Sequence, residues 1–531
     1  PNNCTSKQKT VIFSFVMESY RIGNKEQRIS ALQFFLIWLR NGWKPREKEI
    51  DLLYIMATDT DWEHFGLRYL RTEILCMLNK ESSNVFFEDV DESVIAALYQ
   101  ENQHLDTTWD LTITNLEILQ KYAEQHTDKL LQLGTHLANM LKTSDKIVVR
   151  LQAGKILTEI IPHMRSDERY EIAVELVRNL EIGEESVFKY IPKYLGAIFF
   201  HLPKEAEEEI FASFKIMISA TNDKSAIVSL ETVATIMEQL FIEIRKHPEC
   251  KNNLLKWSER FSGLLYVGMT HFIESVRQEA FYNIGHTIFG SERMTLEDKR
   301  LCFLSMSKKI LSIQKKEHTL VACCDYAASW KHIYSFISDY LFENGNFVIN
   351  REKAVAFFPG TFDPFSQGHK EIVRRIHNLG LEVYTALDEF SWSKRTQHFQ
   401  IRLDILQMSI ADIPDVYLFP TSIPINIANN SDMEKLKRLF PNRKIYLVVG
   451  SDVIRNASAY KGMPEENSVH NFSHIIFYRK SDQHIAEMNS PIKGEIIELE
   501  LSDEFQDISS SRIRNNLDHD QDISNLVEDN V

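Results

Sequence analysis

The sequence predicts a multidomain protein with two architectures: an all-α N-terminal part and a C-terminal α/β part built on a doubly wound parallel sheet. Its 531 residues exceed the roughly 250 to 300 at which single cores stop growing, so we expect at least two domains. Apolar residues recur at helical spacing from about residue 10 to 340, and beyond that point short apolar runs alternate with amphipathic stretches. We therefore place one domain at 1–346 and the other at 347–531.

The composition narrows the classes of function. Hydrophobic residues make up 44% of the chain and charged residues 25%, as in ordinary globular proteins. A formal net charge of -15 disfavours general binding to nucleic acid or to a membrane surface, because phosphate groups would be repelled. No apolar run approaches the roughly 18 residues of a membrane span, and the N-terminus lacks the zones of a signal peptide. We expect a cytoplasmic protein with no nucleic-acid or membrane partner.

The N-terminal part repeats one pattern, an apolar stripe along successive helices. Comparable positions in this helical pattern recur at separations of roughly 40 to 50 residues, the period of two-helix solenoid repeats. These segments resemble HEAT or armadillo repeats, most closely VRQEAFYNIGHTIFG at 276–290. A stack of such repeats usually binds a protein partner or acts as a spacer. An irregular helical bundle remains the alternative.

The C-terminal part begins after Asn344-Gly345-Asn346, which should break the last helix of the array. Predicted strands cover 354–358, 383–387, 416–419, 445–449, 474–478 and 495–499. Predicted helices cover 369–379, 397–410, 431–440 and a stretch from 452 onward. Such alternation predicts a parallel sheet with helices on both faces, in which ligands bind beyond the carboxyl ends of the strands.

The stretch AVAFFPGTFDPFSQGH, residues 354–369, carries the strongest functional signal. A short buried strand leads through a loop into a helix that begins at Gly368-His369 and should end at Gly380, in a left-handed conformation. The free N–H groups and the dipole at such a helix start favour a bound anion. By spacing alone, this is a phosphate site.

Two motifs add a resemblance. GTFDPFSQGH resembles the first signature of the nucleotidylyltransferase superfamily, (H/T)xGH after GxFDP, and Ile508 to Arg514, ISSSRIR, resembles its second signature, ISSTxIR. Both occur in the expected order. The resemblance implies a Rossmann-like nucleotidylyltransferase fold for residues 347–531.

Further details are most similar to nicotinate or nicotinamide mononucleotide adenylyltransferases. Lys394 stands in the loop after the second strand, where these enzymes commonly carry a lysine, and Arg402 matches an RxxM-type helix loosely. Gly450-Ser451-Asp452 is followed eight positions later by Tyr460, where an aromatic residue stacks on the pyridine ring in the family. The resemblance thus implies a pyridine mononucleotide as acceptor.

The implied reaction joins the acceptor phosphate to the α-phosphorus of ATP and releases pyrophosphate. Catalysis then needs positioning and charge neutralisation, with Mg²⁺ bridging the phosphates and no metal held by a side-chain cluster. The resemblance implies catalytic roles for His369, Arg514, Lys394 and Ser366. It implies nucleotide binding by Gly360, Thr361, Phe362, Asp363, Gly368, Gly450, Asp452, Ser509, Ser510 and Ser511. It implies acceptor binding by Tyr460, Arg402, Trp392 and Arg479.

Some features leave the substrate open. Ser366 stands where the family prefers His or Thr, although its hydroxyl can still contact a phosphate. Alternatives are cytidylyl or other nucleotidyl transfer to a different phosphate acceptor, and a degenerate nucleotide sensor or scaffold with protein-binding repeats. The chain begins at Pro1, and DISNLVEDNV at 522–531 has the look of the start of a closing helix. We therefore expect a fragment of a longer polypeptide.

Overall fold

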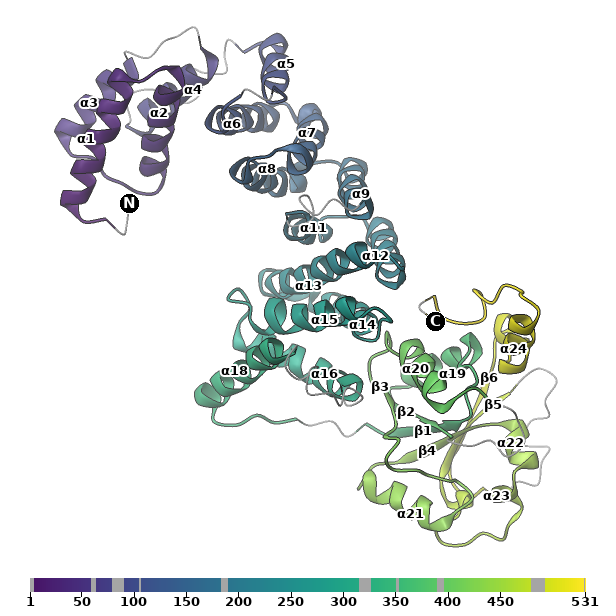
Figure 1. Ribbon diagram of the computed structural model, residues 1–531. Helices are drawn as coiled ribbons and strands as arrows, with labels where there is room; N and C mark the ends of the chain where they lie inside the picture. Colours follow the sequence, from purple (N-terminus) through teal and green to yellow (C-terminus); the bar gives the residue numbers. More distant parts are fainter. Residues whose placement is uncertain are drawn as a thin grey trace. The chain divides into compact units, whose positions relative to one another are not determined.

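The computed structural model describes residues 4–58, 64–78, 90–104, 107–182, 190–314, 326–349, 353–388, 396–478, 492–529 and 531. The chain divides into two compact units, Pro1–Glu208 and Glu209–Val531, and Figure 1 labels their elements. The second unit contains the sheet together with several helices of the N-terminal part. The domain boundary at 346 therefore stays a prediction from the sequence.

The first unit is built from helices, as predicted. They are α1 (Ser6–Ile22), α2 (Lys25–Arg40), α3 (Glu47–Thr58), α4 (Phe65–Met77), α5 (Glu92–Glu101), α6 (Trp109–Gln125), α7 (Leu130–Thr143), α8 (Ile147–Ile160), α9 (Ser166–Ile182) and α11 (Ile191–Phe199), with α12 (Lys204–Ser219) crossing into the second unit. Local sequence sets their starts: Thr5 and Asn24 each cap a helix in a capping box with the glutamine three residues on.

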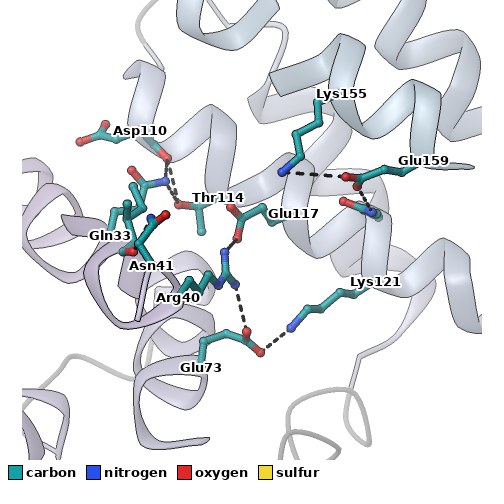
Figure 2. Close-up of polar contacts among 12 residues, drawn as sticks. Gln33, Arg40, Asn41, Glu73, Asp110, Thr114, Glu117, Lys121, Lys155 and Glu159 are labelled. Carbon is teal, nitrogen blue, oxygen red and sulfur yellow. Dashed lines mark hydrogen bonds and ion pairs between the residues drawn. The ribbon is translucent and has the colours of Figure 1, made fainter. Parts of the chain in front are cut away.

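One group of ion pairs ties three of these helices together, and Figure 2 shows it. Arg40 of α2 lies 3.0 Å from a carboxylate oxygen of Glu73 in α4 and 3.0 Å from one of Glu117 in α6. Lys121 of α6 also pairs with Glu73. Burial would lower the pKa of the Arg40 guanidinium, but Glu117 and Glu73 raise it above its ordinary value. We call these four residues the Arg40 cluster.

The second unit begins with further helices, which confirms the predicted all-α part. They are α13 (Asp223–Lys246), α14 (Lys251–Met269), α15 (Glu274–Asn283), a π-helical turn (Ile284–Phe289), α16 (Leu296–Gln314) and α18 (Ala327–Asn344). Among the described residues, α13 alone is long and apolar enough to cross a membrane, and 72% of that stretch is buried inside the protein. α18 ends at Gly345 with a φ of 75°, where the helix was predicted to break. The resemblance to HEAT repeats stays a prediction.

The six-stranded sheet has the predicted parallel, doubly wound form. Its strands are β1 (Val355–Gly360), β2 (Glu382–Leu387), β3 (Val416–Leu418), β4 (Ile445–Gly450), β5 (Ser473–Tyr478) and β6 (Ile496–Glu500). Every neighbouring pair is parallel, in the order β3-β2-β1-β4-β5-β6. This order reverses between β1 and β4, and doubly wound sheets bind ligands at such a switch point.

Alternation along the strands divides the core between the two faces. Val355 and Phe357 of β1 join one apolar cluster with α21 (Asn430–Leu439) and α22 (Ser451–Asn456). Ala356 and Phe358 join the other cluster, with α19 (Gln367–Asn378) and α20 (Phe399–Ser409). Figure 1 shows these helix pairs on opposite faces of the sheet. Burial on both faces explains why the strands are continuous apolar runs.

The end of the chain differs from the sequence-based expectation. After α24 (Ser510–Asp518), residues 519–529 form turns, not the start of another helix. Leu526 and Val527 are buried against Ile508 and Ile513, so this segment packs as an apolar anchor. Asn525 and its polar neighbours favour turns over a continuous helix.

Candidate active site

A cavity of about 1150 Å³ opens at the carboxyl ends of the central strands. Segments that follow β1, β2 and β4 line it, together with the starts of α19 and α24. The structure thereby brings both sequence motifs to one place. The predicted site residues that line the cavity are Gly360, Thr361, Phe362, Asp363, Ser366, Gly368, His369, Gly450, Asp452, Ser509, Ser510, Ser511 and Arg514.

Ser366 and His369 form a reciprocal cap at the start of α19. The Ser366 hydroxyl oxygen accepts the backbone N–H of His369, and the Ser366 N–H donates to Nδ1 of the His369 ring at 3.1 Å. Because Nδ1 accepts this bond, the proton of the neutral imidazole belongs on Nε2. The Ser366 hydroxyl, on a side chain only 2% exposed, also lies 2.9 Å from Nδ1, so it orients the histidine ring at the cavity.

Three aromatic rings surround His369. The ring centroids of Phe362 and Phe365 lie 5.2 and 5.3 Å from that of His369, and the centroid of Phe358 lies 6.3 Å away. Close packing of this kind restricts the side chain to few rotamers. The imidazole is therefore held in place both by its cap hydrogen bond and by its neighbours.

The loop between β1 and α19 is compact and strained. Phe362 has a φ of 41°, in the left-handed region, which costs a bulky residue about 1 to 2 kcal/mol. A Cβ on Gly360 would lie 2.8 Å from the Phe362 ring, so this turn requires glycine. Phe362 itself is buried. Its packing against Phe358 and His369 offsets the strain.

The second motif reaches the first through α24. Ser509 caps this helix by accepting the N–H of Arg512, and the Ser510 hydroxyl donates to the carbonyl of Pro364 at 2.9 Å. Arg514 donates to the backbone carbonyl of Asp363 and lies 3.3 Å from its carboxylate. The two helix starts and the Arg514 guanidinium therefore meet at one edge of the cavity, where they can neutralise phosphate charge.

The loop after β4 also depends on glycine. A Cβ on Gly450 would lie 2.4 Å from a carboxylate oxygen of Asp452 and 3.2 Å from the Phe477 ring. Asp452 is exposed and lines the cavity. The absence of a side chain at 450 lets the Asp452 carboxylate fold back over the end of β4.

Arg402 supports the loops that line the cavity but does not line it. It is 1% exposed and does not appear in the cavity lining. Its guanidinium donates to the carbonyls of Thr361, Asp388 and Gln397 at 2.7, 3.1 and 3.0 Å. Burial raises the pKa of the nearby Asp388 carboxyl, while Arg402 opposes that rise. Arg402 thus joins the loops after β1 and β2, and its acceptor-binding role stays a prediction.

Tyr460 lies outside the cavity lining, in the short helix α23 (Ser458–Lys461). Its side chain belongs to the apolar cluster beneath the sheet and is 5% exposed. Its hydroxyl lies 2.9 Å from Nε2 of His474. The predicted stacking on a pyridine ring therefore has no support from the observed position. Three other predicted residues, Lys394, Trp392 and Arg479, lie outside the described residues.

The sequence analysis did not single out several residues that shape the site. The apolar wall of the cavity includes Phe399, Ile423, Ile425 and Ile427, from α20 and the segment after β3. Gln367 and Lys370 each bind Glu528 beside the start of α19. Gln367 and Lys370 flank the recognised Gly368-His369, but nothing in the sequence pairs them with the distant Glu528.

Residues 357–516 match the family model described as cytidylyltransferase-like. This part of the chain is a cytidylyltransferase-like domain, in agreement with its motifs and its parallel sheet. The match begins within β1 and includes the whole of both motifs, residues 360–369 and 508–514.

Two relatives show how the similarity is distributed. A probable nicotinate-nucleotide adenylyltransferase of Fusobacterium nucleatum is 26% identical over 186 residues, 33% of this chain and 94% of the relative. A phosphopantetheine adenylyltransferase of Nitrosospira multiformis is 36% identical over 67 residues, 13% of this chain and 41% of the relative. The chain thus matches less than half of the second relative's length.

A solved structure is also similar to part of this chain. It is Plasmodium falciparum nicotinic acid mononucleotide adenylyltransferase complexed with APC, with 19% sequence identity and a TM-score of 0.28. The similarity covers 33% of this chain and 90% of that one.

Proposed function

We propose that the C-terminal domain transfers AMP from ATP to nicotinate or nicotinamide mononucleotide and releases pyrophosphate. The observation that carries this proposal is the convergence of two helix starts, His369 and Arg514 on one cavity. The similarity to a probable nicotinate-nucleotide adenylyltransferase along most of that relative's length supports the choice of acceptor.

The reaction forms one bond and breaks another. An oxygen of the acceptor phosphate attacks the α-phosphorus of ATP, the bond from that phosphorus to the bridging oxygen breaks, and pyrophosphate leaves with the electron pair. Negative charge grows on the α-phosphoryl oxygens and on the leaving group. Nε2–H of His369 would donate to an α-phosphoryl oxygen, because its ring faces the cavity with Nδ1 already bonded.

The second motif would hold the leaving group. Arg514 carries a fixed positive charge, and the start of α24 offers free N–H groups beside Ser510 and Ser511. Held in place before the reaction, these donors need little reorganisation as charge develops. Arg514 would keep its bond to the carbonyl of Asp363 while it contacts phosphate, since a guanidinium has five donors.

Mg²⁺ fits this cavity as an ion held mainly by the nucleotide. Mg²⁺ usually keeps several waters and binds substrate phosphates with one or two carboxylates. The Asp363 carboxylate already accepts from Arg514 and from the N–H of Gln397, so we assign it to the loop. When bound, the ion would neutralise phosphate charge.

The test is pyrophosphate release by the full chain with Mg-ATP and a panel of acceptors. The panel contains nicotinate mononucleotide, nicotinamide mononucleotide, phosphopantetheine and polyol phosphates, and it is repeated with Mg-CTP. Release with a pyridine mononucleotide and ATP supports the proposal. Turnover with other acceptors only, or none in a folded sample, contradicts it.

Phosphopantetheine is the second candidate acceptor. The observation in its favour is the 36% identity to a phosphopantetheine adenylyltransferase. That similarity covers only 41% of the relative. It is therefore weaker support for an acceptor than the similarity to the nicotinate-nucleotide adenylyltransferase, which covers 94% of that relative. The same panel separates the two acceptors. If phosphopantetheine is the acceptor, it should be the one member of the panel that gives turnover with ATP.

A further inference from the structure

Residues 523–528, here called the tail segment, contact both helices that open onto the phosphate site. Leu526 and Val527 are buried in an apolar cluster with Ile508 and Ile513, which belong to the second motif and α24. The cluster fixes the tail segment to α24. The tail segment also makes a separate set of polar contacts with α19.

Gln367, the first residue of α19, binds the tail segment three times. Its N–H donates to the carbonyl of Leu526 at 2.9 Å. Its side-chain amide donates to the carbonyl of Val527 and to a carboxylate oxygen of Glu528, both at 2.9 Å. The start of α19 is thus attached to the tail segment two residues before His369.

Lys370 adds a buried ion pair directly after His369. Its ammonium lies 2.7 Å from a Glu528 oxygen and 2.7 Å from an Asp412 oxygen. The Lys370 side chain is 1% exposed, and that of Glu528 is 7% exposed. Burial would raise the pKa of Asp412, but Lys370 lowers it below its ordinary value. Glu528 therefore binds α19 on both sides of the histidine. We call Lys370, Asp412 and Glu528 the Lys370 cluster.

The helices that precede the sheet reach the same place. Lys215 of α12 lies 3.6 Å from Glu528 and 3.6 Å from Asp529. Gly263 of α14 packs so closely on Asp412 that a Cβ there would lie 2.5 Å from the Asp412 carbonyl oxygen. Lys309 of α16 donates to the carbonyls of Ile410, Ile413 and Val416, on either side of Asp412.

We propose that Glu528 is a positioning residue that sets the start of α19 relative to α24, so that His369 and Arg514 act on one polyphosphate. The tail segment has apolar contacts to α24 and polar contacts to α19, and Glu528 supplies the charged part of the second set. Buried charge pairs of this kind fix geometry because neither partner can leave alone without cost. The reaction concerned rests on the proposed function, while the contacts themselves do not.

The test compares neighbouring carboxylates. Glu528→Ala removes the bonds to Gln367 and Lys370, and Glu528→Gln keeps an oxygen that can still accept from Gln367 but loses the charge. Asp529→Asn is the matched control, since Asp529 contacts Lys215 without contacting α19 and is 60% exposed. The affinity for Mg-ATP is measured by calorimetry and turnover by pyrophosphate release, with the folded fraction of each variant set from its unfolding curve.

We expect Glu528→Ala to weaken Mg-ATP binding and to lower kcat, each by about tenfold or more, since a displacement near 1 Å can cost about 10²-fold. The KM for the acceptor should change less than either. Glu528→Gln should recover part of both losses, and Asp529→Asn should match the wild-type protein. A merely structural role would reduce the folded fraction while the affinity of the folded protein stayed constant.

The outcomes separate this proposal from the proposed function. If the wild-type protein binds Mg-ATP but turns over no acceptor, only the proposed function fails, and the affinities still test Glu528. If Glu528→Ala binds Mg-ATP as tightly as Asp529→Asn, the positioning role is wrong. Failure of the wild-type protein to bind Mg-ATP would overturn both.

Discussion

The Arg40 cluster and the Lys370 cluster join helices with the same kinds of charge but in different surroundings. In the Arg40 cluster, the side chains of Arg40 and Lys121 are each 34% exposed. In the Lys370 cluster, the side chain of Lys370 is 1% exposed and both its carboxylate partners are within 2.7 Å. The Arg40 cluster is therefore half-buried, since the Glu73 and Glu117 side chains are 13% and 19% exposed, and the Lys370 cluster is buried more deeply beside the candidate active site.

This difference determines what each cluster can do. Ion pairs in contact with water gain little, because solvent screens them and both side chains lose freedom. A buried pair has already lost its hydration, so removing one partner leaves an uncompensated charge. The Lys370 cluster can therefore hold a fixed geometry, whereas the Arg40 cluster contributes modestly to local stability. Four substitutions test the contrast.

Lys370→Met should have the largest effect on stability. It removes the nearest cation from the Asp412 and Glu528 carboxylates, which keep only the more distant Arg374 and Lys215 at 3.7 and 3.6 Å. Breaking a buried pair in this way costs about 3 to 5 kcal/mol. Hydrogen exchange of the full-length protein, followed by mass spectrometry, should show this loss in peptides from α19 and residues 410–416. Peptides of the first unit serve as the internal control. A loss below about 1 kcal/mol would place this cluster in the class of exposed pairs.

His369→Ala changes the residue directly before Lys370. It separates a loss of catalysis from a loss of helix positioning. Loss of one preorganised donor should lower kcat by about 10² to 10³. Hydrogen exchange in residues 410–416 should stay as in the wild-type protein, because the His369 ring bonds to Ser366 and packs on Phe362 and Phe365, all in the loop before α19. His377→Ala, on the same helix but away from the cavity lining, is the matched control. Equal kcat values for the two variants would remove His369 from the reaction.

The sheet was predictable because its signal is local. The buried faces of β1 and β4 need continuous apolar runs, and their predicted limits agree with the observed ones within two residues. Gly380 has the expected positive φ of 82°, since a left-handed residue after a helix favours glycine. The spacing of Ser366 and His369 is also that of the capping box that the structure shows at the start of α19, so this cap has a local signal in the sequence as well.

The rest of the site depends on contacts between distant residues. Nothing near Glu528 in the sequence indicates Lys370 or Gln367 as partners, because charge pairing has no period along the chain. Tyr460 shows a second difficulty. Its distance from Asp452 fits an aromatic residue at the site, but a short helix turns its side chain toward His474 in the core. Spacing fixes the backbone position and leaves the direction of a side chain open.

Tyr460→Phe tests whether the Tyr460 side chain points into the core. There it belongs to a buried hydrogen-bond network that carries no formal charge. Burial lowers the pKa of His474 to about 4, so the ring is neutral near pH 7. Its Nδ1–H donates to the carbonyl of Phe472, and Nε2 accepts from the Tyr460 hydroxyl. Removing that hydroxyl leaves a buried acceptor without a donor, at a cost of about 1 to 3 kcal/mol.

The measurement for Tyr460 is an unfolding curve combined with steady-state kinetics. Stability should fall in Tyr460→Phe while kcat and the KM for a pyridine mononucleotide stay unchanged. Tyr460→Leu adds the decisive control, because it also removes the ring. A KM that rises about tenfold in Tyr460→Leu, but not in Tyr460→Phe, would show that the ring contacts the acceptor after all.

Arg40→Met should have the smallest effect of the four. Exposed pairs are worth about 0.2 to 1 kcal/mol each, and Glu73 keeps Lys121 as a partner, so the loss should be near 1 kcal/mol in peptides of α2, α4 and α6. Methionine preserves most of the apolar stem, which limits the change to the charge. The loss should shrink in about 1 M salt, where the screening length falls to about 3 Å, whereas the effect of Lys370→Met should persist. Arg21→Met, at a site 74% exposed, gives the baseline for an isolated surface pair. A loss of several kcal/mol that salt did not change would mean that burial is not what separates the two clusters.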